Sequence, residues 1–356
     1  MLYISDDQVD QLASMDDALT IARDAFTAQG LGLATNIPRR RAEIDGAAIN
    51  IMGGALQAPP HDVRMTHDVG WLGAKVSASA GTGKMAWVLL FDADGVLRCL
   101  LGANRLGQLR TGAGTGVSTD LLARPDSRVL ACIGSGYQAW TQVEAVTLVR
   151  NLERIHVWSR TTRNAQDFAG RLQMRFGIPA EAFERVPEAV VEADVVVTIT
   201  SAVLPILRGA DVKNGAHVVL AGSNHPQHRE ADSDLFRRAH GVYVDDLAQA
   251  QEVSGDLRLA VEEGACNWEE VQPLGLLMSP PADRAGSAGP RHAEPTVFCS
   301  QGVGSWDVAL ASAVYTRACA QHVGVELPVD GAPEPRLGPR RRETRNPAVP
   351  ETRRDS

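Results

Sequence analysis

This chain of 356 residues, 44% hydrophobic and 22% charged, is long enough for two domains with substantial cores. Its formal net charge of −8 excludes a globally basic surface of the kind that binds nucleic acid, and no window approaches the roughly 18 consecutive apolar residues of a membrane span. The N-terminus has acids where a signal peptide has a basic region, and the five cysteines are scattered without a CxxC pair. We therefore expect a cytoplasmic protein with no membrane or nucleic-acid partner and no metal site.

The first third of the chain carries mainly β signals after a helical start. Residues 2–4 predict a short strand, and a helix ending near residue 30 follows, with Asp16 or Asp17 as its cap. A glycine- and threonine-rich segment over 104–122 predicts a closely packed helix, which a break at 123–126 ends. Between these helices, apolar runs predict strands at 47–52, 71–80, 86–91 and 96–101, the last two joined by a turn.

The most informative pattern lies between residues 129 and 158. An apolar run at 129–133 ends in the Gly-x-Gly-x-x-Ala sequence of residues 134–139, and a helical pattern and a second apolar run at 155–158 follow. This order of strand, glycine turn, helix and strand is typical of a dinucleotide-binding βαβ unit. Gly134 would allow the tight turn and Gly136 the close approach of a pyrophosphate, which would lie at the helix N-terminus. The expected cofactor contacts here are Gly134, Ser135, Gly136, Tyr137 and Gln138.

Apolar runs then continue in alternation with helical patterns at 195–200, 217–222 and 241–244. Such alternation predicts an α/β fold with a Rossmann-type, doubly wound parallel sheet. A last short strand is predicted at 296–298 and a helix at 307–320. Residues 331–356 are Pro, Arg and Glu with few apolar residues, which predicts a disordered tail.

The end of the second strand of this unit bears on the choice of cofactor. NAD-binding proteins place an acidic residue there to hold the ribose 2′-hydroxyl, whereas a small polar residue with an arginine accommodates the 2′-phosphate of NADP. Here the strand ends in Ser159, Arg160 and Thr161, without an acid. The sequence thus favours NADP(H) over NAD(H), although Arg160 could also cover the adenine of either cofactor.

Several motifs together carry a family resemblance. The segment 109–113, Leu-Arg-Thr-Gly-Ala, precedes the glycine turn, and Gly-Ala-Lys-Val stands at 73–76. Ala-Gly-Ser-Asn at 221–224 is followed by Arg-Glu at 229–230, and Thr-Val-Phe at 296–298 by Gly302 and Asp307. In this order, from about residue 38 to 320, the motifs resemble the ornithine cyclodeaminase/mu-crystallin family.

The resemblance implies a split architecture and a homodimer. Residues 1–124 would form a mixed α+β substrate-binding and dimerisation domain, and residues 125–305 the NAD(P)-binding Rossmann domain. Residues 306–330 would form a C-terminal helix that returns to the first domain, ahead of the tail at 331–356. Family members transfer a hydride between nicotinamide and the α-carbon of an amino acid, through an imine.

The resemblance also suggests how a substrate carboxylate would bind. Lys75 and Arg110 are lone cations among small or apolar residues and match the family's carboxylate-binding positions, as does one of Arg39, Arg40 and Arg41. Strand alternation would put Arg39 and Arg41 on one face and Arg40 on the other. An internal salt bridge is the alternative for Lys75 and Arg110. Further cofactor contacts are expected at Thr111, Thr200, Gly222, Ser223 and Gly302; Thr111 and Thr115 could bind phosphate or ribose, or could only pack their helix.

One position departs from the family pattern. Asn224 stands where cyclodeaminases carry an aspartate, and an amide cannot take up a proton at neutral pH. His225 beside it titrates near neutrality and could replace the acid–base group, unless it is only a surface residue. Asp307, at the start of the last helix, is either an N-cap or a catalytic residue.

These observations predict an NAD(P)H-dependent oxidoreductase that acts on the C–N bond of a small α-amino or α-imino acid. The preferred reaction is reduction of an imine or ketimine carboxylate. An ornithine or lysine cyclodeaminase with recycled NAD is a first alternative, which Asn224 disfavours. A non-catalytic, crystallin-like nucleotide-binding protein is a second.

Overall fold

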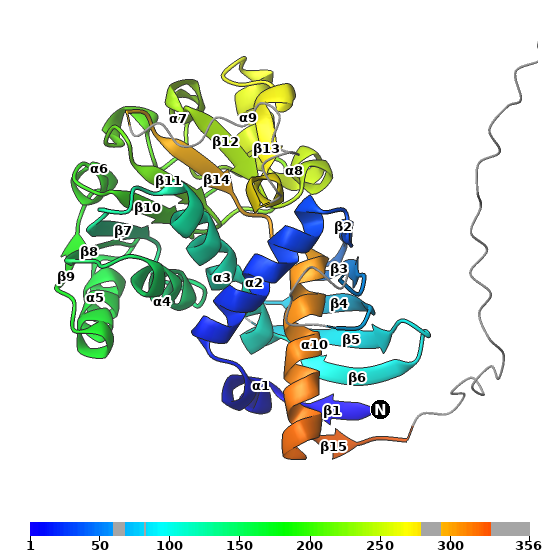
Figure 1. The fold of residues 1–356 in the computed structure, drawn as a ribbon. Helices are drawn as coiled ribbons and strands as arrows, with labels where there is room; N and C mark the ends of the chain where they lie inside the picture. Colours follow the sequence, from blue (N-terminus) through cyan, green and yellow to red (C-terminus); the bar gives the residue numbers. More distant parts are fainter. Residues whose placement is uncertain (60–67, 82, 279–292, 329–356) are drawn as a thin grey trace, which may run out of the picture.

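The computed structural model describes residues 1–59, 68–81, 83–278 and 293–328, and these form two sheets with helices packed around them (Figure 1). The first sheet has the strand order β15-β1-β6-β5-β4-β3-β2. Its strands are β1 (Leu2–Ile4), β2 (Ala34–Ile44), β3 (Ala47–Leu56), β4 (Trp71–Ala80), β5 (Gly83–Asp92), β6 (Leu97–Gly102) and β15 (Val325–Glu326). Its strands β2 to β6 are antiparallel, and β1 lies parallel to β6, so the sheet is mixed.

The second sheet is parallel throughout and has the order β13-β12-β14-β11-β10-β7-β8-β9. Its strands are β7 (Val129–Ile133), β8 (Arg154–Trp158), β9 (Ala180–Phe183), β10 (Val195–Thr198), β11 (His217–Leu220), β12 (Gly241–Val244), β13 (Val271–Pro273) and β14 (Thr296–Cys299). The strand order reverses between β7 and β10, which is where a doubly wound sheet opens a crevice for ligands. The α/β fold class with a second, mixed sheet is confirmed.

Helices cover both sheets and join them. Helix α10 (Gly304–Gln321) packs on β3, β4 and α2 (Met15–Gly30), and α3 (Asn104–Leu122) packs on both α2 and α10. Segments from both ends of the chain and from the end of its first third therefore meet beside the first sheet (Figure 1). The helices are α1 (Asp6–Leu12), α2 (Met15–Gly30), α3 (Asn104–Leu122), α4 (Ala139–Val149), α5 (Thr162–Phe176), α6 (Val186–Val190), α7 (Ser233–Arg238), α8 (Leu247–Val253), α9 (Gly255–Glu262) and α10 (Gly304–Gln321), with 3₁₀ turns η1 (Gly209–Asp211), η2 (Trp268–Glu270) and η3 (Leu274–Met278).

The N-terminal expectations need two corrections. The single helix predicted there is two helices, α1 and α2, separated by a break at Ala13 and Ser14. Neither Asp16 nor Asp17 is the cap of α2, because Ser14 takes that place. The Asp17 carboxylate instead accepts a hydrogen bond from the Ser14 backbone N–H (2.9 Å) and completes a capping box. The short strands β9 and β13 were not predicted, since neither is a continuous apolar run.

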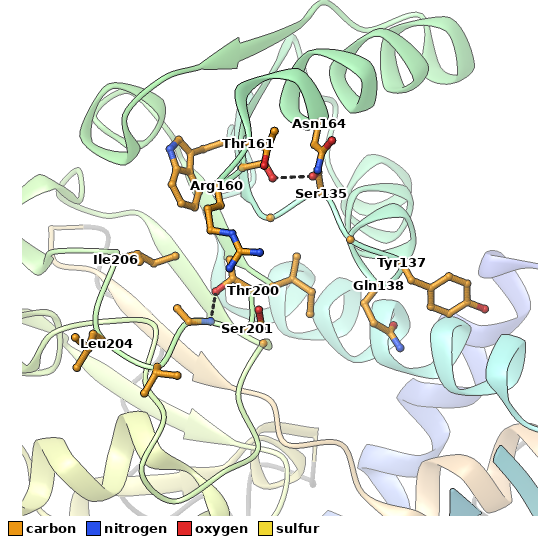
Figure 2. Close-up of a pocket in the computed structure, with 18 of the residues that line it drawn as sticks. Ser135, Tyr137, Gln138, Arg160, Thr161, Asn164, Thr200, Ser201, Leu204 and Ile206 are labelled. Carbon is orange, nitrogen blue, oxygen red and sulfur yellow. Dashed lines mark hydrogen bonds between the residues drawn. The ribbon is translucent and has the colours of Figure 1, made fainter. Parts of the chain in front are cut away.

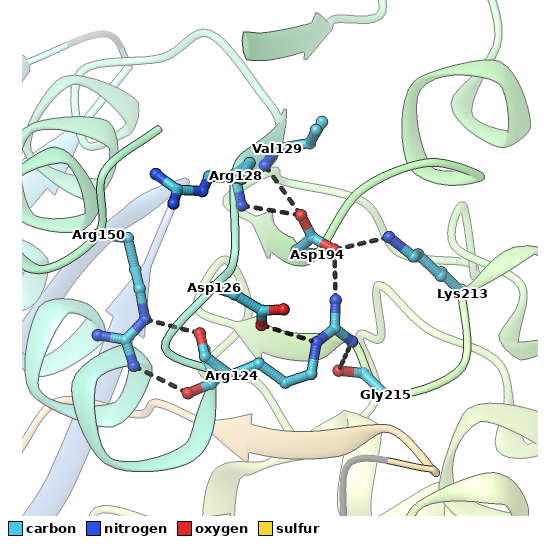
Figure 3. Close-up of polar contacts among 9 residues, drawn as sticks. Arg124, Asp126, Arg128, Val129, Arg150, Asp194, Lys213 and Gly215 are labelled. Atoms are coloured by element: carbon cyan, nitrogen blue, oxygen red, sulfur yellow. Dashed lines mark hydrogen bonds and ion pairs between the residues drawn. The ribbon is translucent and has the colours of Figure 1, made fainter. Parts of the chain in front are cut away.

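A polar cluster lies at the amino ends of β7 and β10, on the opposite side of the parallel sheet from the crevice, which is at the carboxyl ends (Figure 3). The Asp194 carboxylate accepts hydrogen bonds from the backbone N–H groups of Arg128 (2.8 Å) and Val129 (3.1 Å). It also pairs with Arg124 and Lys213, each at 2.6 Å. The cluster therefore ties the starts of two adjacent strands together and has a structural role. No helix within the described residues is long and apolar enough to cross a membrane.

Candidate active site

A cavity of about 870 Å³ lies at the carboxyl ends of β7, β8 and β10, where the strand order reverses. One wall is the glycine turn at 134–138, and the others are the loops that follow β8 and β10 (Figure 2). Figure 2 shows Arg160 and Thr161 coming from the first of these loops and Thr200, Ser201, Leu204 and Ile206 from the second. We refer to this cavity as the nucleotide crevice.

The glycine turn has the shape that phosphate binding requires. Gly134 has φ +125°, and a Cβ there would lie 2.5 Å from the Ile199 carbonyl oxygen, so only glycine fits the turn. A Cβ on Gly136, in contrast, would meet nothing within 4 Å and would project into open space along the crevice wall. Gln138, at the start of α4, has a buried Oε1 without a hydrogen-bond partner in the described chain. The turn thus leaves room for a ligand's phosphates at the N-terminus of α4.

The end of β8 carries only neutral and cationic groups toward the crevice. Ser159, Arg160, Thr161 and Asn164 line it, and Ser135 donates a hydrogen bond to the Ser159 hydroxyl (2.9 Å). No aspartate or glutamate is among the described residues that line the crevice. The wall at this end is therefore electropositive, with Arg160 exposed at the surface.

A buried carboxylate holds the loops that follow β10 and β11. Glu230 accepts hydrogen bonds from the Thr198 hydroxyl (2.7 Å), from the Thr200 N–H and hydroxyl (both 2.7 Å) and from the Gly222 N–H (2.8 Å). Burial raises the pKa of Glu230, and the four donors oppose that rise. Thr200 and Gly222 line the crevice, so Glu230 fixes two segments beside it, the loop after β10 and the loop after β11.

A second cavity of about 550 Å³ adjoins the crevice, and we call it the cationic cavity. It lies between the first sheet and the loops of the second, and it shares Lys84, Tyr137, Gln138, Ile199 and Gly222 with the crevice. Four cationic side chains line it: Arg39, Lys75, Lys84 and Arg110. A small anionic ligand in this cavity would therefore contact whatever occupies the inner end of the crevice.

Two of these cations are buried and share one carboxylate. Lys75, on β4, and Arg110, on α3, are only 8% and 7% exposed. The Lys75 ammonium lies 3.0 Å from Oδ1 of Asp307, and Arg110 Nε lies 3.2 Å from the same oxygen. The other carboxylate oxygen, Oδ2, is buried without a hydrogen-bond partner in the described chain. The salt bridge considered as an alternative for Lys75 and Arg110 thus exists, but both side chains also reach the cavity.

The close charges shift the pKa values of this cluster. Burial and the neighbouring Arg110 charge lower the pKa of Lys75 to about 7. Burial disfavours the charged form of Asp307, but the Arg110 and Lys75 charges outweigh it and hold its pKa below the ordinary value. Lys75 is thus a cation that can lose its proton near neutral pH.

Asp307 is not a helix cap. Helix α10 begins at Gly304 with Val303 as its N-cap, which places Asp307 at the fourth helical position. It does not line either cavity, because Lys75 and Arg110 lie between it and the cationic cavity. We therefore regard it as a positioning residue that orients the two cations.

The loop before α10 closes the cavity beside Arg110. Gly302 has φ +70°, and a Cβ at this position would collide with the Arg110 guanidinium. The buried Asp245 carboxylate accepts the backbone N–H groups of Gln301 (2.7 Å) and Gly302 (2.5 Å), and Gln249 donates to the Gly302 carbonyl (2.8 Å). Burial raises the pKa of Asp245 to about 7, and these backbone donors oppose the rise.

Only one of the three arginines on β2 reaches the cavity. Arg39 donates to the Gln301 carbonyl oxygen (3.2 Å), and its Nε is buried without a partner in the described chain. Arg41, expected on the same face, is exposed and pairs with Glu43, while Arg40 pairs with Glu252. The pairing of β2 with β3 shifts register between Ile37 and Arg40, and such a bulge breaks the simple alternation on which the Arg41 prediction depended.

Residues 224 and 225 differ in position. Asn224 lines the cationic cavity, but His225 lines neither cavity and its ring stacks on His228 with centroids 4.1 Å apart. Desolvation and the His228 charge lower the pKa of His225. The structure therefore gives no geometry for His225 as a substitute acid–base group.

Three further polar side chains expected at the cofactor are occupied elsewhere. The Ser223 hydroxyl donates to the His228 carbonyl (3.0 Å) and lines neither cavity. Thr115 is buried and donates to Gln142, so it packs its helix. Thr111 lines the cationic cavity, but its hydroxyl donates to the Gly107 carbonyl of its own helix (2.6 Å). The spacing of His61, His67 and His217 in the sequence does not match a metal site; His61 and His67 lie outside the described residues, and His217 is buried beside Thr296.

Sequence reasoning missed Lys84 and Asp245, and it singled out Glu230 only as part of the Arg-Glu motif at 229–230, without a role. The hairpin of β4 and β5 pairs Lys84 with Ser79, on the face that also holds Lys75, so a register drawn through the hairpin would have found it. Asp245 acts on a loop more than fifty positions away, so it left no local signal, and the motif at 229–230 does not reveal which loops Glu230 holds.

Comparison with known proteins places this geometry in context. A family model described as "Ornithine cyclodeaminase/mu-crystallin family" matches residues 3–322. The chain is 35% identical over 229 residues to a Delta(1)-pyrroline-2-carboxylate reductase of Bacillus cereus, covering 64% of this chain and 69% of that protein. It is 37% identical over 241 residues to ketimine reductase mu-crystallin of Mus musculus, covering 67% and 71%.

A solved structure gives the same result for the fold. Thermococcus litoralis Delta(1)-pyrroline-2-carboxylate reductase, in complex with NADH and L-proline, superposes with a TM-score of 0.83 at 27% identity. The match covers 92% of this chain and 100% of that one. The resemblance inferred from the motifs is therefore confirmed, and the matched region contains both cavities.

Proposed function

We propose, because the chain belongs to the ornithine cyclodeaminase/mu-crystallin family, that it is an NAD(P)H-dependent oxidoreductase that reduces the C=N bond of a small α-imino acid. The observation that carries this proposal is the pair of buried cations, Lys75 and Arg110, in a cavity that opens into the nucleotide crevice. The named relatives, a pyrroline-2-carboxylate reductase and a ketimine reductase, support the same class of reaction.

In this proposal the substrate's α-carboxylate binds to Arg110 and Lys75. The guanidinium can offer two parallel N–H groups to a carboxylate, and its Nε stays bonded to Asp307. Arg39, held by the Gln301 carbonyl, lies on the same cavity wall as a further donor. The imine carbon is thereby held toward the crevice, where Gly222 and Ile199 form the shared wall.

The glycine turn and the N-terminus of α4 would hold a dinucleotide, and its nicotinamide would supply the hydride for the imine carbon. As the carbon–hydrogen bond forms, the C=N electron pair moves to nitrogen, which takes one proton and becomes the amine. With its pKa of about 7, Lys75 can supply a proton near neutral pH. Asn224, at the cavity wall, can donate a hydrogen bond from its amide without exchanging a proton.

We further propose NADP(H) as the preferred cofactor. The described residues that line the crevice include no acid to hold a ribose 2′-hydroxyl, and Arg160 with Ser159 and Thr161 stands at the end of β8. These side chains are suited to pair with a 2′-phosphate. A comparison of kcat/KM for NADPH and NADH tests this point, and equal values would contradict it.

We also propose that the outer face of the first sheet forms a homodimer. Ile49, Ile51, Leu72 and Met85 alternate with the cavity-facing residues and are between 40% and 56% exposed. An apolar face of this kind on a soluble enzyme marks an interaction surface. The family's expected dimer would cover it with the same face of a second copy.

Ile51→Glu tests the dimer directly. A buried charge on each side of the interface should convert the dimer to a monomer in sedimentation equilibrium, with the fold retained by circular dichroism. Met174→Glu, on exposed α5 and 88% exposed, is the matched control and should sediment as the wild type does. A wild-type protein of monomeric mass would contradict the proposal.

The described cysteines are consistent with the cytoplasm as the proposed location. All five are free thiols, and four of them are buried. Burial raises the pKa of Cys132 to about 12, so its thiol is inert. Free thiols are usual in a reducing compartment.

Lys75 should make catalysis depend on pH. The pH dependence of kcat/KM reports the pKa values of groups in the free enzyme. The substrate carboxylate requires the charged form of Lys75, so kcat/KM for a cyclic imine carboxylate should fall as pH rises through about 7. Lys75→Arg keeps its charge at high pH but releases no proton near neutrality, so its kcat/KM should be lower than that of the wild type and should not fall through pH 7. Lys213→Arg, at the Asp194 cluster, is the control and should follow the wild-type profile. Superimposable profiles for wild type and Lys75→Arg would show that Lys75 does not titrate in this range.

The proposed activity is tested by following NADPH and NADH at 340 nm. A 2-oxo acid and ammonia form an imine and water, and the imine, NAD(P)H and a proton give the amino acid and NAD(P)⁺. Oxidation of NADPH that requires an imine establishes the reductase. Ammonia release from ornithine or lysine without net absorbance change would instead identify a cyclodeaminase. Tight nucleotide binding without turnover of any imine would identify a non-catalytic binding protein.

A further inference from the structure

Gln249 is a buried side chain on α8 that lines neither cavity and has no direct part in the proposed reaction. Its amide oxygen accepts a hydrogen bond from the Arg39 backbone N–H (3.2 Å) and a longer one from the Asn36 side-chain amide (3.5 Å). Its amide nitrogen donates to the Gly302 carbonyl oxygen (2.8 Å). One side chain from the parallel-sheet half of the molecule therefore joins β2 of the first sheet to the loop before α10.

Both ends of the Gln249 amide meet backbone groups, which fixes the orientation of the amide. A backbone N–H can only donate and a backbone carbonyl can only accept, so the amide oxygen has to face Arg39 and the amide nitrogen Gly302. The backbone N–H of Gln249 donates to the Asp246 carboxylate that caps α8 (2.7 Å), which holds the residue in the first turn of the helix. An uncharged amide of this length is therefore the group that fits between the two segments.

The two segments that Gln249 joins each bear on one guanidinium of the cationic cavity. Strand β2 carries Arg39, which lines the cavity and donates from its side chain to the Gln301 carbonyl oxygen (3.2 Å). The other segment contacts Arg110, because a Cβ added at Gly302 would collide with that guanidinium. The length of the Gln249 side chain thus sets how far the strand that carries Arg39 stands from the loop that contacts Arg110.

Like charges act against this spacing. Burial and the Arg110 charge lower the pKa of Arg39 to about 10, so the two guanidiniums repel each other across the cavity. No carboxylate of the described chain forms an ion pair with Arg39, so hydrogen bonds have to hold it in place. Asn36 supplies one more link, because its Oδ1 accepts the Gly304 backbone N–H (2.8 Å) at the start of α10. Without the Gln249 amide, β2 would keep its contact at Gly304 but would be free to move at Arg39.

We propose that Gln249 is a positioning residue whose amide sets the spacing of Arg39 and Arg110, and with it the affinity of the cationic cavity for a substrate carboxylate. This inference rests on the proposed reductase function and gives that function a residue outside both cavities. Gln249 acts through the two arginines and not through contact with the ligand. Displaced guanidiniums no longer aim their N–H groups at one carboxylate, so the loss should fall on substrate binding.

Gln249→Met tests this role, because it keeps the length of the side chain and removes both hydrogen bonds. With full-length protein and a preformed cyclic imine carboxylate, KM should rise at least about tenfold, and kcat should fall less than about threefold. The dissociation constant for NADPH should stay as in the wild type, since Gln249 does not line the nucleotide crevice. Gln251→Met, at an exposed position on the same helix, is the control and should behave as the wild type does. An unchanged KM in Gln249→Met would overturn the proposal.

A double substitution separates positioning from general damage to the fold. In an Arg39→Met background, Gln249→Met should raise KM less than about threefold, because one of the two side chains that it positions is absent. The same fold increase in both backgrounds would show a structural effect and overturn the proposal.

Gln249→Asn covers the case in which Gln249→Met does not fold. It keeps a polar amide in the buried position, but its side chain is one methylene shorter and cannot join both partners. Its KM should rise about fivefold, in line with the loss of one hydrogen bond. A wild-type KM in a folded Gln249→Asn variant would show that the spacing does not depend on this amide.

A binding measurement distinguishes this inference from the proposed reaction. The wild type and Gln249→Met, both saturated with NADP⁺, are titrated with L-proline and with pyruvate as carboxylate probes. Gln249→Met should bind the tighter probe about tenfold more weakly. If no imine is turned over but this difference remains, the reductase function fails and the positioning role stands. If imines are turned over and the two proteins bind both probes equally, the reductase function stands and the positioning role is overturned.

Discussion

Replacement of Arg110 by methionine should lower kcat/KM for an imino acid by roughly 10²–10³-fold, mainly through KM. The guanidinium is 7% exposed at the cavity floor and is the side chain best suited to hold a carboxylate with two parallel hydrogen bonds. Truncating one partner of a buried, hydrogen-bonded charge pair costs about 2–5 kcal/mol. The expected loss, which is roughly 2.7–4.1 kcal/mol at about 1.4 kcal/mol per factor of ten, lies within this range. Steady-state kinetics with a preformed cyclic imine carboxylate measures it.

Two controls separate substrate binding from damage to the fold. Arg110→Lys keeps the charge but not the forked geometry, and it should recover less than about a tenth of the lost activity. Nucleotide binding should persist in both variants, since Arg110 does not line the nucleotide crevice. A variant that loses nucleotide affinity as well as activity would show that the effect is structural, and unchanged kcat/KM would remove Arg110 from the site.

Asp307→Asn should have the largest effect on stability. It removes the only carboxylate that contacts Lys75 and Arg110 among the described residues, leaving two buried cations without compensation. Breaking a buried ion pair from one side costs about 3–5 kcal/mol of unfolding free energy. Urea denaturation at pH 6 should show a loss of this size, with loss of activity because the two cations are no longer oriented.

The same loss should shrink at high pH, and a second substitution should recover part of it. Lys75 has a pKa of about 7 in the folded protein, below its ordinary value of 10.5, so above pH 7 the unfolded chain binds more protons. Stability contributed by this group therefore rises with pH, and the cost of Asp307→Asn falls as Lys75 becomes neutral. Lys75→Met in the Asp307→Asn background should recover stability at pH 6. Additive losses from the two substitutions would show that the residues are not coupled.

The nucleotide half of the site could be predicted from the sequence because its signals are local. The turn at 134–138 has a fixed spacing of glycines between a strand and a helix, and the strand that follows determines which side chains stand at its end. Residues 159–161 line the crevice for this reason. Lys75 and Arg110 could also be found, since each is a lone cation within an apolar element.

The rest depends on contacts between distant segments. The register shift near Arg40 decides which arginine reaches the cavity, and it arises from the pairing of β2 with β3. Asp307 acquires its role because α10 packs beside β4, which no local cap signal reveals. Neither the stacking of His225 on His228 nor the burial of Ser223 is visible in the sequence around position 224.

The sharing of one carboxylate by two cations also has a consequence for the order of assembly. Lys75 and Asp307 are 232 positions apart, with the entire parallel sheet between them. During synthesis, β7 to β14 can pair before α10 has emerged, whereas Lys75 on β4 and Arg110 on α3 have to stay hydrated without their carboxylate until the last helix arrives. The nucleotide-binding unit should therefore fold first, and the floor of the cationic cavity should be the last part of the molecule to lose its hydration water.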